Sequence, residues 1–299
     1  MKINLKAHAA VIGANLIFGT SYSVVKMITP GFLPAFGLNA FRVITAIILF
    51  SAMFWVTPGK AWPNKKDVPR LILCALTGIV INQLLFIKGV SLTSPIHSAL
   101  LSLATPIFIT GIAVWLLKET FTTIKALGLL LGMSGAAILI LIKSTTGSNN
   151  SSLAGDCMVL LNAISYSFYL VWVKPLMIEY KGTDILRWLF LLGAVIILPL
   201  GVPDLIHTNF GGWTNVEWCA LLFIGIGATF LAYLFNLYGI ARIGAAATGT
   251  YIYTQPVFAA LIAGIFYGEK LSLTQIMAAL FIFSGVYLVN YKKSDTPLG

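Results

Sequence analysis

The sequence predicts an all-α membrane protein in which ten transmembrane helices form two inverted five-helix repeats. Three observations predict this fold: an apolar composition, ten apolar runs long enough to cross a bilayer, and a similarity between the two halves of the chain. Of the 299 residues, 59% are hydrophobic and only 9% are charged, and the mean hydropathy is +0.94. Soluble domains carry about 25% charged residues, so this composition is typical of membrane proteins.

The apolar runs come first in this prediction. A helix of about 20 apolar residues crosses a hydrocarbon core of about 30 Å. The runs cover residues 7–28, 34–57, 69–88, 94–117, 123–142, 153–175, 183–203, 216–238, 245–267 and 273–291. Short connections with turn residues, such as Pro30-Gly31 and Pro58-Gly59, separate them. No connection is long enough for a soluble domain, so we expect the function to lie within the membrane.

The basic residues give an orientation. The net charge is +10, but these residues sit in short loops between apolar runs rather than on one solvated face, which argues against a nucleic-acid partner. With the N-terminus inside, the inner loops and both termini hold most Lys and Arg residues. The outer connections hold Lys26, Lys88, Lys143 and Lys270. The positive-inside rule therefore predicts a multi-pass protein of the cell membrane with both termini in the cytoplasm.

Cysteine usage predicts neither a disulfide framework nor a metal site. Cys74, Cys157 and Cys219 are odd in number, scattered, and lie in or near apolar runs without metal-ligand spacing. We interpret them as small packing residues and expect no cofactor.

The two halves of the chain are similar at an offset of 150 residues. The matched pairs are Gly89 with Gly239, Pro106 with Pro256, Glu119 with Glu269, and Gly135 with Gly285. The predicted repeats are residues 1–147 and 148–299. Each holds five spans, an odd number, so the second repeat would enter the membrane from the opposite side. Inverted repeats of this kind are typical of secondary transporters, whose substrate site lies near the midplane between the repeats.

The paired prolines fall near the middle of the fourth and ninth spans. Proline removes a backbone hydrogen bond and presses on the preceding turn, so each helix should kink or loosen at Pro106 or Pro256. We interpret the pair as hinges or gates, because interrupted helices occur at transporter binding sites. A static kink that helps packing is the alternative.

Two segments carry a resemblance to a known family. They are LSLATPIFITGIAVWLLKETFT followed by Gly135, and YTQPVFAALIAGIFYGEKLSLTQ followed by Gly285, with support from Asn39-Ala40-Phe41-Arg42. The pattern resembles the drug/metabolite transporter superfamily in its EamA-like branch, over about residues 8–291. The resemblance implies a ten-span transporter, and the family moves amino acids, drugs, nucleobases, sugars and other metabolites.

Polar residues inside the spans are the candidate solute-binding residues. Such residues are costly in lipid and tend to face the bundle interior or an aqueous cavity. The candidates are Asn15, Tyr22, Asn82, Gln83, Asn162, Tyr166, Tyr169, Tyr233, Asn236, Tyr251 and Gln255. Together they would give a cavity of amides, hydroxyls and aromatic faces. Alternatively, each side chain bridges two helices by a hydrogen bond.

Two ionisable residues complete the candidate site. Arg42 lies within the second span, where it could attract a substrate carboxylate or, as we favour from sequence, donate to carbonyls between helices. His97 lies near the outer end of the fourth span and is of a residue type that can act as a proton carrier, although a lone histidine more often bridges helices. Glu119 and Glu269 are expected to accept from helix-end amides.

These features predict a secondary exporter of a small neutral, zwitterionic or aromatic metabolite, such as an amino acid. None of the nine acidic residues lies at a span centre, so uniport or exchange is expected rather than an ion relay. Proton-coupled drug or nucleoside efflux and a lipid-linked sugar flippase remain alternatives. A membrane enzyme or a channel would need motifs that the sequence lacks. Gly128-x3-Gly132 is expected to pack helices within a monomer rather than to form a dimer.

Overall fold

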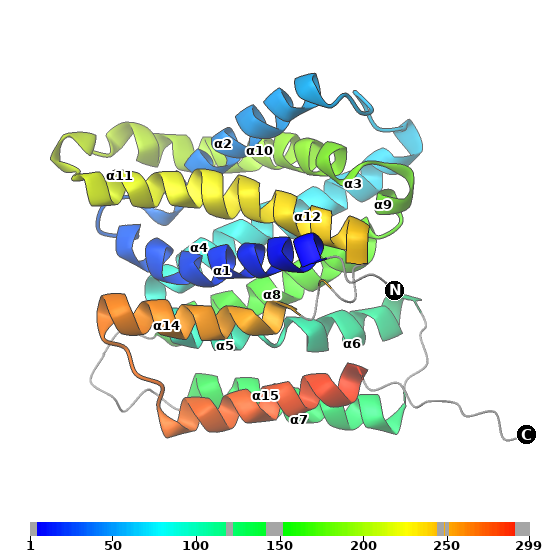
Figure 1. The fold of residues 1–299 in the computed structure, drawn as a ribbon, viewed down its shortest axis with the longest axis vertical. Helices are drawn as coiled ribbons and strands as arrows, with labels where there is room; N and C mark the ends of the chain where they lie inside the picture. The colour runs from blue at the N-terminus through cyan, green and yellow to red at the C-terminus, as the bar shows by residue number, and fades with distance from the viewer. Residues whose placement is uncertain (1–4, 118–121, 142–151, 244–247, 249–250, 291–299) are drawn as a thin grey trace, which may run out of the picture.

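The computed structural model describes residues 5–117, 122–141, 152–243, 248 and 251–290. All regular secondary structure in these ranges is helical, and the long helices run side by side across the molecule (Figure 1). The first half holds α1 (Leu5–Ile28), α2 (Ala35–Val56), η1 (Lys65–Asp67), α3 (Val68–Ala75), η2 (Leu76–Val80), α4 (Ile81–Leu92), α5 (Pro95–Ser102), α6 (Thr105–Leu117) and α7 (Thr123–Leu141). The second half holds α8 (Leu153–Val173), α9 (Leu176–Glu179), α10 (Gly182–His207), η3 (Phe210–Gly212), α11 (Asn215–Leu222), η4 (Phe223–Leu231), α12 (Ala232–Ile243), η5 (Tyr251–Thr254), α14 (Gln255–Tyr267) and α15 (Leu273–Asn290).

Seven helical stretches in the described residues are long and apolar enough to cross a membrane. They are Leu5–Ile28, Ala35–Val56, Lys65–Leu92, Pro95–Ile112, Leu153–Val173, Gly182–His207 and Asn215–Ile243. Three shorter apolar helices are Thr123–Ile138, Tyr251–Tyr267 and Leu273–Leu288. Each of the ten predicted runs overlaps one of these helices, although the ninth run begins in residues outside the described ranges. The protein is thus an all-helical membrane protein.

The fourth and ninth predicted runs are interrupted where the sequence predicts weak points. Helix α5 ends at Ser102 and α6 begins at Thr105, so Pro106 is the second residue of α6. In the second half, the 3₁₀ turn η5 precedes α14, and Pro256 is the second residue of α14. A proline in the first turn of a helix loses no hydrogen bond, because the first amides have no partner in the helix. Both prolines therefore lie at the start of an α-helix, and their role as hinges or gates stays a prediction.

Corresponding helices of the two halves pack against each other in antiparallel pairs. A Cβ on Gly285 of α15 would lie 2.6 Å from the Gly128 carbonyl oxygen, and one on Gly135 of α7 would lie 2.7 Å from the Ala278 carbonyl oxygen. The beginning of α7 therefore lies beside the end of α15, and the end of α7 beside the beginning of α15, so the two helices are antiparallel. Figure 1 shows them side by side. The small residues allow this close approach, so the predicted packing role of the glycines within one chain is confirmed.

Both halves also contain a π-helical segment that the sequence reading missed. Segment η2 precedes α4, and segment η4 precedes α12. At the offset of 150, η2 corresponds to residues 226–230, which lie inside η4. In each segment the closing amide bonds to a carbonyl five residues earlier, at Ile81 and at Ala232. Single π turns in α-helices are frequent at functional sites.

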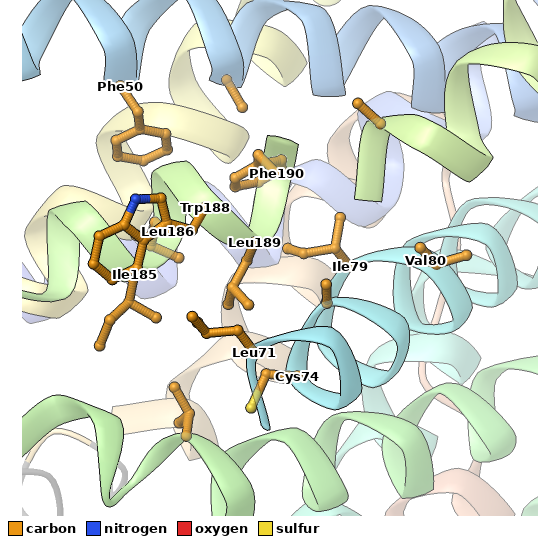
Figure 2. Close-up of a cluster of buried hydrophobic side chains, with 14 of the residues drawn as sticks. Phe50, Leu71, Cys74, Ile79, Val80, Ile185, Leu186, Trp188, Leu189 and Phe190 are labelled. Carbon is orange, nitrogen blue, oxygen red and sulfur yellow. The ribbon is translucent and has the colours of Figure 1, made fainter. Parts of the chain in front are cut away.

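The largest buried cluster lies on one side of the bundle, where α2, α3, η2 and α10 meet (Figure 2). Phe50 of α2 stacks on Phe190 of α10 with ring centroids 5.9 Å apart. The Cys74 thiol is buried in the same cluster, in agreement with its predicted packing role. These contacts hold α2 and α10 together beside the cavity described next.

Candidate functional site

A cavity of about 150 Å³ lies between the helices of the two halves. This volume is comparable to cavities that admit a benzene-sized molecule. The lining residues are Asn15, Phe18, Ser21, Tyr22, Val25, Arg42, Asn82, Gln83, Phe86, Ser102, Thr105, Asn162, Tyr166, Ile224, Ala228, Tyr233, Asn236, Ile252 and Gln255. They come from α1, α2, α4, α5 and α6 in the first half, and from α8, η4, α12, η5 and α14 in the second. The cavity is therefore a shared product of both halves.

Ten of the predicted solute-binding residues line this cavity. They are Asn15, Tyr22, Arg42, Asn82, Gln83, Asn162, Tyr166, Tyr233, Asn236 and Gln255. The structure brings these side chains together from six helices, although they are far apart in the sequence. That they bind a solute stays a prediction.

Three predicted residues lie elsewhere. Tyr169 fills the space beside Gly78, where a Cβ would be only 2.5 Å from its ring, so it packs into the large core cluster. The Tyr251 hydroxyl lies 2.6 Å from Nδ1 of His8, near the start of α1. His97 pairs with an aspartate outside the cavity lining. Helical spacing alone could not separate these three from the cavity residues, because the neighbouring helices decide which face stays open.

Arg42 is the one residue with a formal charge among the lining residues. Its side chain is buried, with 6% exposure, and its Nε donates to Oγ1 of Thr229 at 2.9 Å. Thr229 in turn donates to the carbonyl of Ile224, five residues earlier in η4, at 2.8 Å. The π-helical segment thus holds the acceptor for Arg42. No Asp or Glu of the described residues forms an ion pair with it.

Amide side chains connect the cavity walls. Gln255 Nε2 donates to Asn15 Oδ1 at 2.8 Å, which links α14 to α1. Asn162 Nδ2 donates to the carbonyl of Asn82 at 2.7 Å, which links α8 to α4. The sequence left open whether these amides bridge helices or line a cavity. In the structure, Asn15, Gln255 and Asn162 do both.

Gln83 differs from the other amides. It is 1% exposed, and neither its Oε1 nor its Nε2 has a hydrogen-bond partner of acceptable geometry. Its side chain lies beside the Tyr233 hydroxyl. At the offset of 150, Gln83 and Tyr233 are equivalent residues of the two halves, and both line the cavity between the halves. A buried amide without partners is costly, which makes Gln83 a group that a ligand can satisfy.

Aromatic rings form the apolar part of the wall. Phe18 packs edge-on against Tyr233 with centroids 5.9 Å apart, and Tyr22 packs against Phe86 at 5.2 Å. Phe18 and Phe86 were missed as lining residues, since an aromatic residue in an apolar run carries no polar signal. Ser102 and Thr105 were also missed, although they flank the helix break before Pro106.

A second group of buried ionisable residues lies outside the cavity lining. His97 Nε2 is 3.3 Å from Asp156 Oδ2, and Thr93 donates to Asp156 Oδ1 at 2.7 Å. These contacts place α5 against the first turn of α8, although His97 Nε2 makes no hydrogen bond of acceptable geometry there, so a helix-bridging hydrogen bond of His97 stays a prediction. The sequence did not indicate Asp156 as the neighbour of His97, because an acidic residue in the first turn of a helix is expected there for the helix alone.

Glu269 lies between α14 and α15 and interacts with this region. Its carboxylate accepts hydrogen bonds from the Ser94 side chain and from the Ile96 amide at the start of α5, and it lies near His97 and Lys26. This agrees with the predicted role of Glu269 as an acceptor for helix-end amides. Burial nevertheless raises the pKa of the Glu269 carboxyl above its ordinary value. Its counterpart Glu119 lies outside the described residues.

Comparison with known proteins gives a family. The sequence profile of the EamA-like transporter family matches residues 5–141 and 153–291. The chain is 22% identical over 297 residues to the uncharacterized transporter YetK of Bacillus subtilis (strain 168), covering 99% of this chain and 90% of that one. It is 24% identical over 291 residues to a probable terminal-alkyne amino-acid exporter of Streptantibioticus cattleyicolor, covering 97% and 95%.

A solved crystal structure has a similar fold. The two structures superpose with a TM-score of 0.61 at 18% sequence identity, over 95% of this chain and 96% of the other. Because the family profile matches two segments that together span nearly the whole chain, and because relatives of the same length are named transporters, the protein belongs to the EamA-like transporter family of the drug/metabolite transporter superfamily and is a transporter rather than an enzyme.

Proposed function

We propose that this protein is a secondary transporter that exports a small neutral, zwitterionic or aromatic metabolite, such as an amino acid, by alternating access. The observation that carries the proposal is the cavity between the two halves, lined by amides, hydroxyls and aromatic rings from both. A site built at the interface of two similar halves is what transporters with internal repeats use. The name of the amino-acid exporter relative supports the solute class.

The proposal includes ten spans in two inverted repeats, residues 1–147 and 148–299, acting as a monomer. The antiparallel packing of α7 with α15 supports the inversion, because equivalent helices cross in opposite directions. The helix breaks before Pro106 and Pro256 and the paired π-helical segments support a role as hinges. Such weak points allow the halves to exchange conformations with little loss of packing.

The orientation follows from charge. With both termini in the cytoplasm, most Lys and Arg residues face inward, as the positive-inside rule requires. Within the described residues, the cavity lining holds no carboxylate that could relay an ion, which supports uniport or exchange.

Efflux from vesicles tests this proposal. Purified protein is reconstituted in liposomes loaded with labelled phenylalanine, leucine or threonine, and in separate vesicles with a labelled nucleoside or a fluorescent lipid. We expect protein-dependent efflux of amino acids. Tyr233→Leu should reduce efflux about tenfold, whereas Tyr238→Leu, on the same helix but outside the cavity lining, should not. Movement of the lipid alone would replace the proposal with a flippase.

Proton-coupled efflux is a second candidate, favoured by the buried His97–Asp156 pair. An imposed pH gradient in the same vesicles separates the two mechanisms. If the gradient drives solute accumulation in wild-type protein but not in Asp156→Asn, the transport is coupled to protons. If the gradient drives none, uniport or exchange stands.

A further inference from the structure

We propose that the transported solute carries a carboxylate, and that Arg42, Gln83 and Tyr233 form the subsite that binds it. This inference rests on the proposed function and narrows its solute class. Arg42 is the one charged lining residue, and no carboxylate of the described residues offsets it. A buried cation in a membrane protein needs a counter-charge, backbone carbonyls or water, and a solute that brings an anion supplies the first of these.

The position of Arg42 leaves its carboxylate-binding edge available. The guanidinium has five N–H donors, and its one hydrogen bond in the described structure uses Nε. That bond anchors the group to Thr229 in η4. The two terminal nitrogens carry the remaining donors, and such a planar group matches a carboxylate in geometry.

Two further donors line the same cavity as Arg42, namely the Tyr233 hydroxyl and the Gln83 amide. The Tyr233 hydroxyl interacts electrostatically with Arg42 and lies next to the Gln83 amide. The Gln83 amide is almost fully buried, and the Tyr233 hydroxyl beside it makes no hydrogen bond of good geometry with it. A carboxylate at this point would receive hydrogen bonds from all three residues and satisfy the unpartnered amide. The three come from α2, α4 and α12, so binding would also connect the two halves.

The rest of the cavity favours a monoanionic group over other charges. A phosphate dianion would require more than the one cation that the lining provides. No lining residue is acidic, so an ammonium would meet only neutral amide and hydroxyl oxygens and aromatic faces. Asn15 Oδ1 already accepts from Gln255. We therefore expect the carboxylate of the solute to contribute more to binding than an amino group does.

Matched solutes test this subsite. Vesicles carry wild-type protein, Arg42→Gln, Arg42→Lys or Arg187→Gln, and protein-free vesicles measure passive leak. The labelled probes are phenylalanine, 3-phenylpropionate, phenylalaninamide and phenethylamine, with the leucine series as a second set. Arg187 is a matched control, since it is a buried arginine outside the cavity lining.

We expect wild-type protein to move the two carboxylates at least tenfold faster than the amide or the amine. Arg42→Gln should abolish this preference while retaining slow amide transport, which shows that the variant is folded. Arg42→Lys should restore part of the preference, and Arg187→Gln should keep it in full. In detergent, 3-phenylpropionate should raise the melting temperature of the wild type but not of Arg42→Gln.

The possible failures are distinguishable. If wild type moves the acid and its amide at equal rates, or if Arg42→Gln slows both equally, the carboxylate subsite is refuted and the proposed transport stands. Movement of amines or nucleosides without carboxylates has the same meaning. If no solute moves, the proposed function and the subsite fall together.

Discussion

Two buried arginines in the paired helices α2 and α10 have opposite surroundings. Arg42 of α2 is 6% exposed and Arg187 of α10 is 8% exposed. Arg187 donates to the carbonyls of Lys60 and Ala61 at 3.0 and 2.7 Å, and its guanidinium lies 3.8 Å from the centre of the Phe54 ring. Arg42 has one hydroxyl partner and otherwise faces a cavity.

Burial alone therefore does not distinguish an arginine that holds the fold together from an arginine that binds a solute. Arg187 belongs to a connected set of contacts that hold residues 57–67 against the start of α10. Asp184 accepts from the Lys60 amide at 3.0 Å, and the Tyr180 hydroxyl donates to Asp67 at 2.6 Å. Removing Arg187 would leave the Lys60 carbonyl without this donor, whereas the Ala61 carbonyl would keep the Trp188 Nε1 donor at 3.1 Å. Among the described residues, Arg42 has one hydrogen-bond partner, Thr229, so most of its N–H donors remain for a bound solute.

The largest expected effect is a crossed result for these two residues. Arg187→Leu removes two hydrogen bonds from a charged donor and leaves the Lys60 carbonyl unpaired. It should lower stability by about 3 kcal/mol, since hydrogen bonds to charged groups contribute roughly 1.5–3 kcal/mol each. Arg42→Leu replaces a buried charge without an acidic partner and should leave stability unchanged or raised. Melting curves in detergent measure both. A larger loss of stability in Arg42→Leu than in Arg187→Leu would reverse the assignment of roles.

A smaller effect is expected from the acceptor that orients Arg42. Thr229→Val removes the hydroxyl that receives Nε, so the guanidinium loses its anchor in η4. The loss of one hydrogen bond of about 1 kcal/mol corresponds to roughly fivefold weaker solute binding. The control is Thr77→Val in the equivalent segment η2, where the hydroxyl donates only to the Leu73 carbonyl. Competition by phenylalanine for labelled solute efflux measures both, and equal weakening would refute a special role for Thr229.

The sequence predicted the helices and most of the cavity residues, but not the hydrogen-bond partner that distinguishes Arg42 from Arg187. The apolar runs predicted the helices, the paired prolines predicted the helix breaks, and polar residues within spans predicted most of the cavity wall. Arg42 was expected to donate to carbonyls, whereas its partner is the Thr229 hydroxyl. That partner lies 187 residues away, and it is presented by a π-helical turn, for which hydrophobic periodicity gives no signal.

The location of His97 and Tyr169 was beyond the sequence for a similar reason. Helical spacing places a side chain on a face, but the neighbour across that face decides its environment. Gly78 makes room for Tyr169 in the core, and Asp156 pairs with His97 from the start of another helix. Contacts of this kind join residues that are distant in the chain, so one sequence without its fold cannot specify them.

The smallest expected effect extends the comparison to a buried carboxylate. Glu269 has partners on every side, namely Ser94, the Ile96 amide, His97 and Lys26, yet burial is the largest influence and raises its pKa above 4.5. The folded state therefore holds this proton more tightly than the unfolded state. Stability should be greatest below the ordinary pKa of the carboxyl and should fall as the pH rises through the raised folded value.

Glu269→Gln should remove this part of the pH dependence and leave the preference for carboxylate solutes intact, because Glu269 is not a lining residue of the cavity. Melting temperatures between about pH 4 and pH 8 measure the slope. Glu179→Gln is the control, since that carboxylate lies in a partly exposed ion pair with Lys66 at 3.5 Å, and it should keep the wild-type slope above pH 4.5. A slope unchanged in Glu269→Gln would mean that its four partners fully compensate its burial, as the carbonyls do for Arg187. A loss of solute preference would instead place Glu269 with Arg42, among the charges that act on the solute.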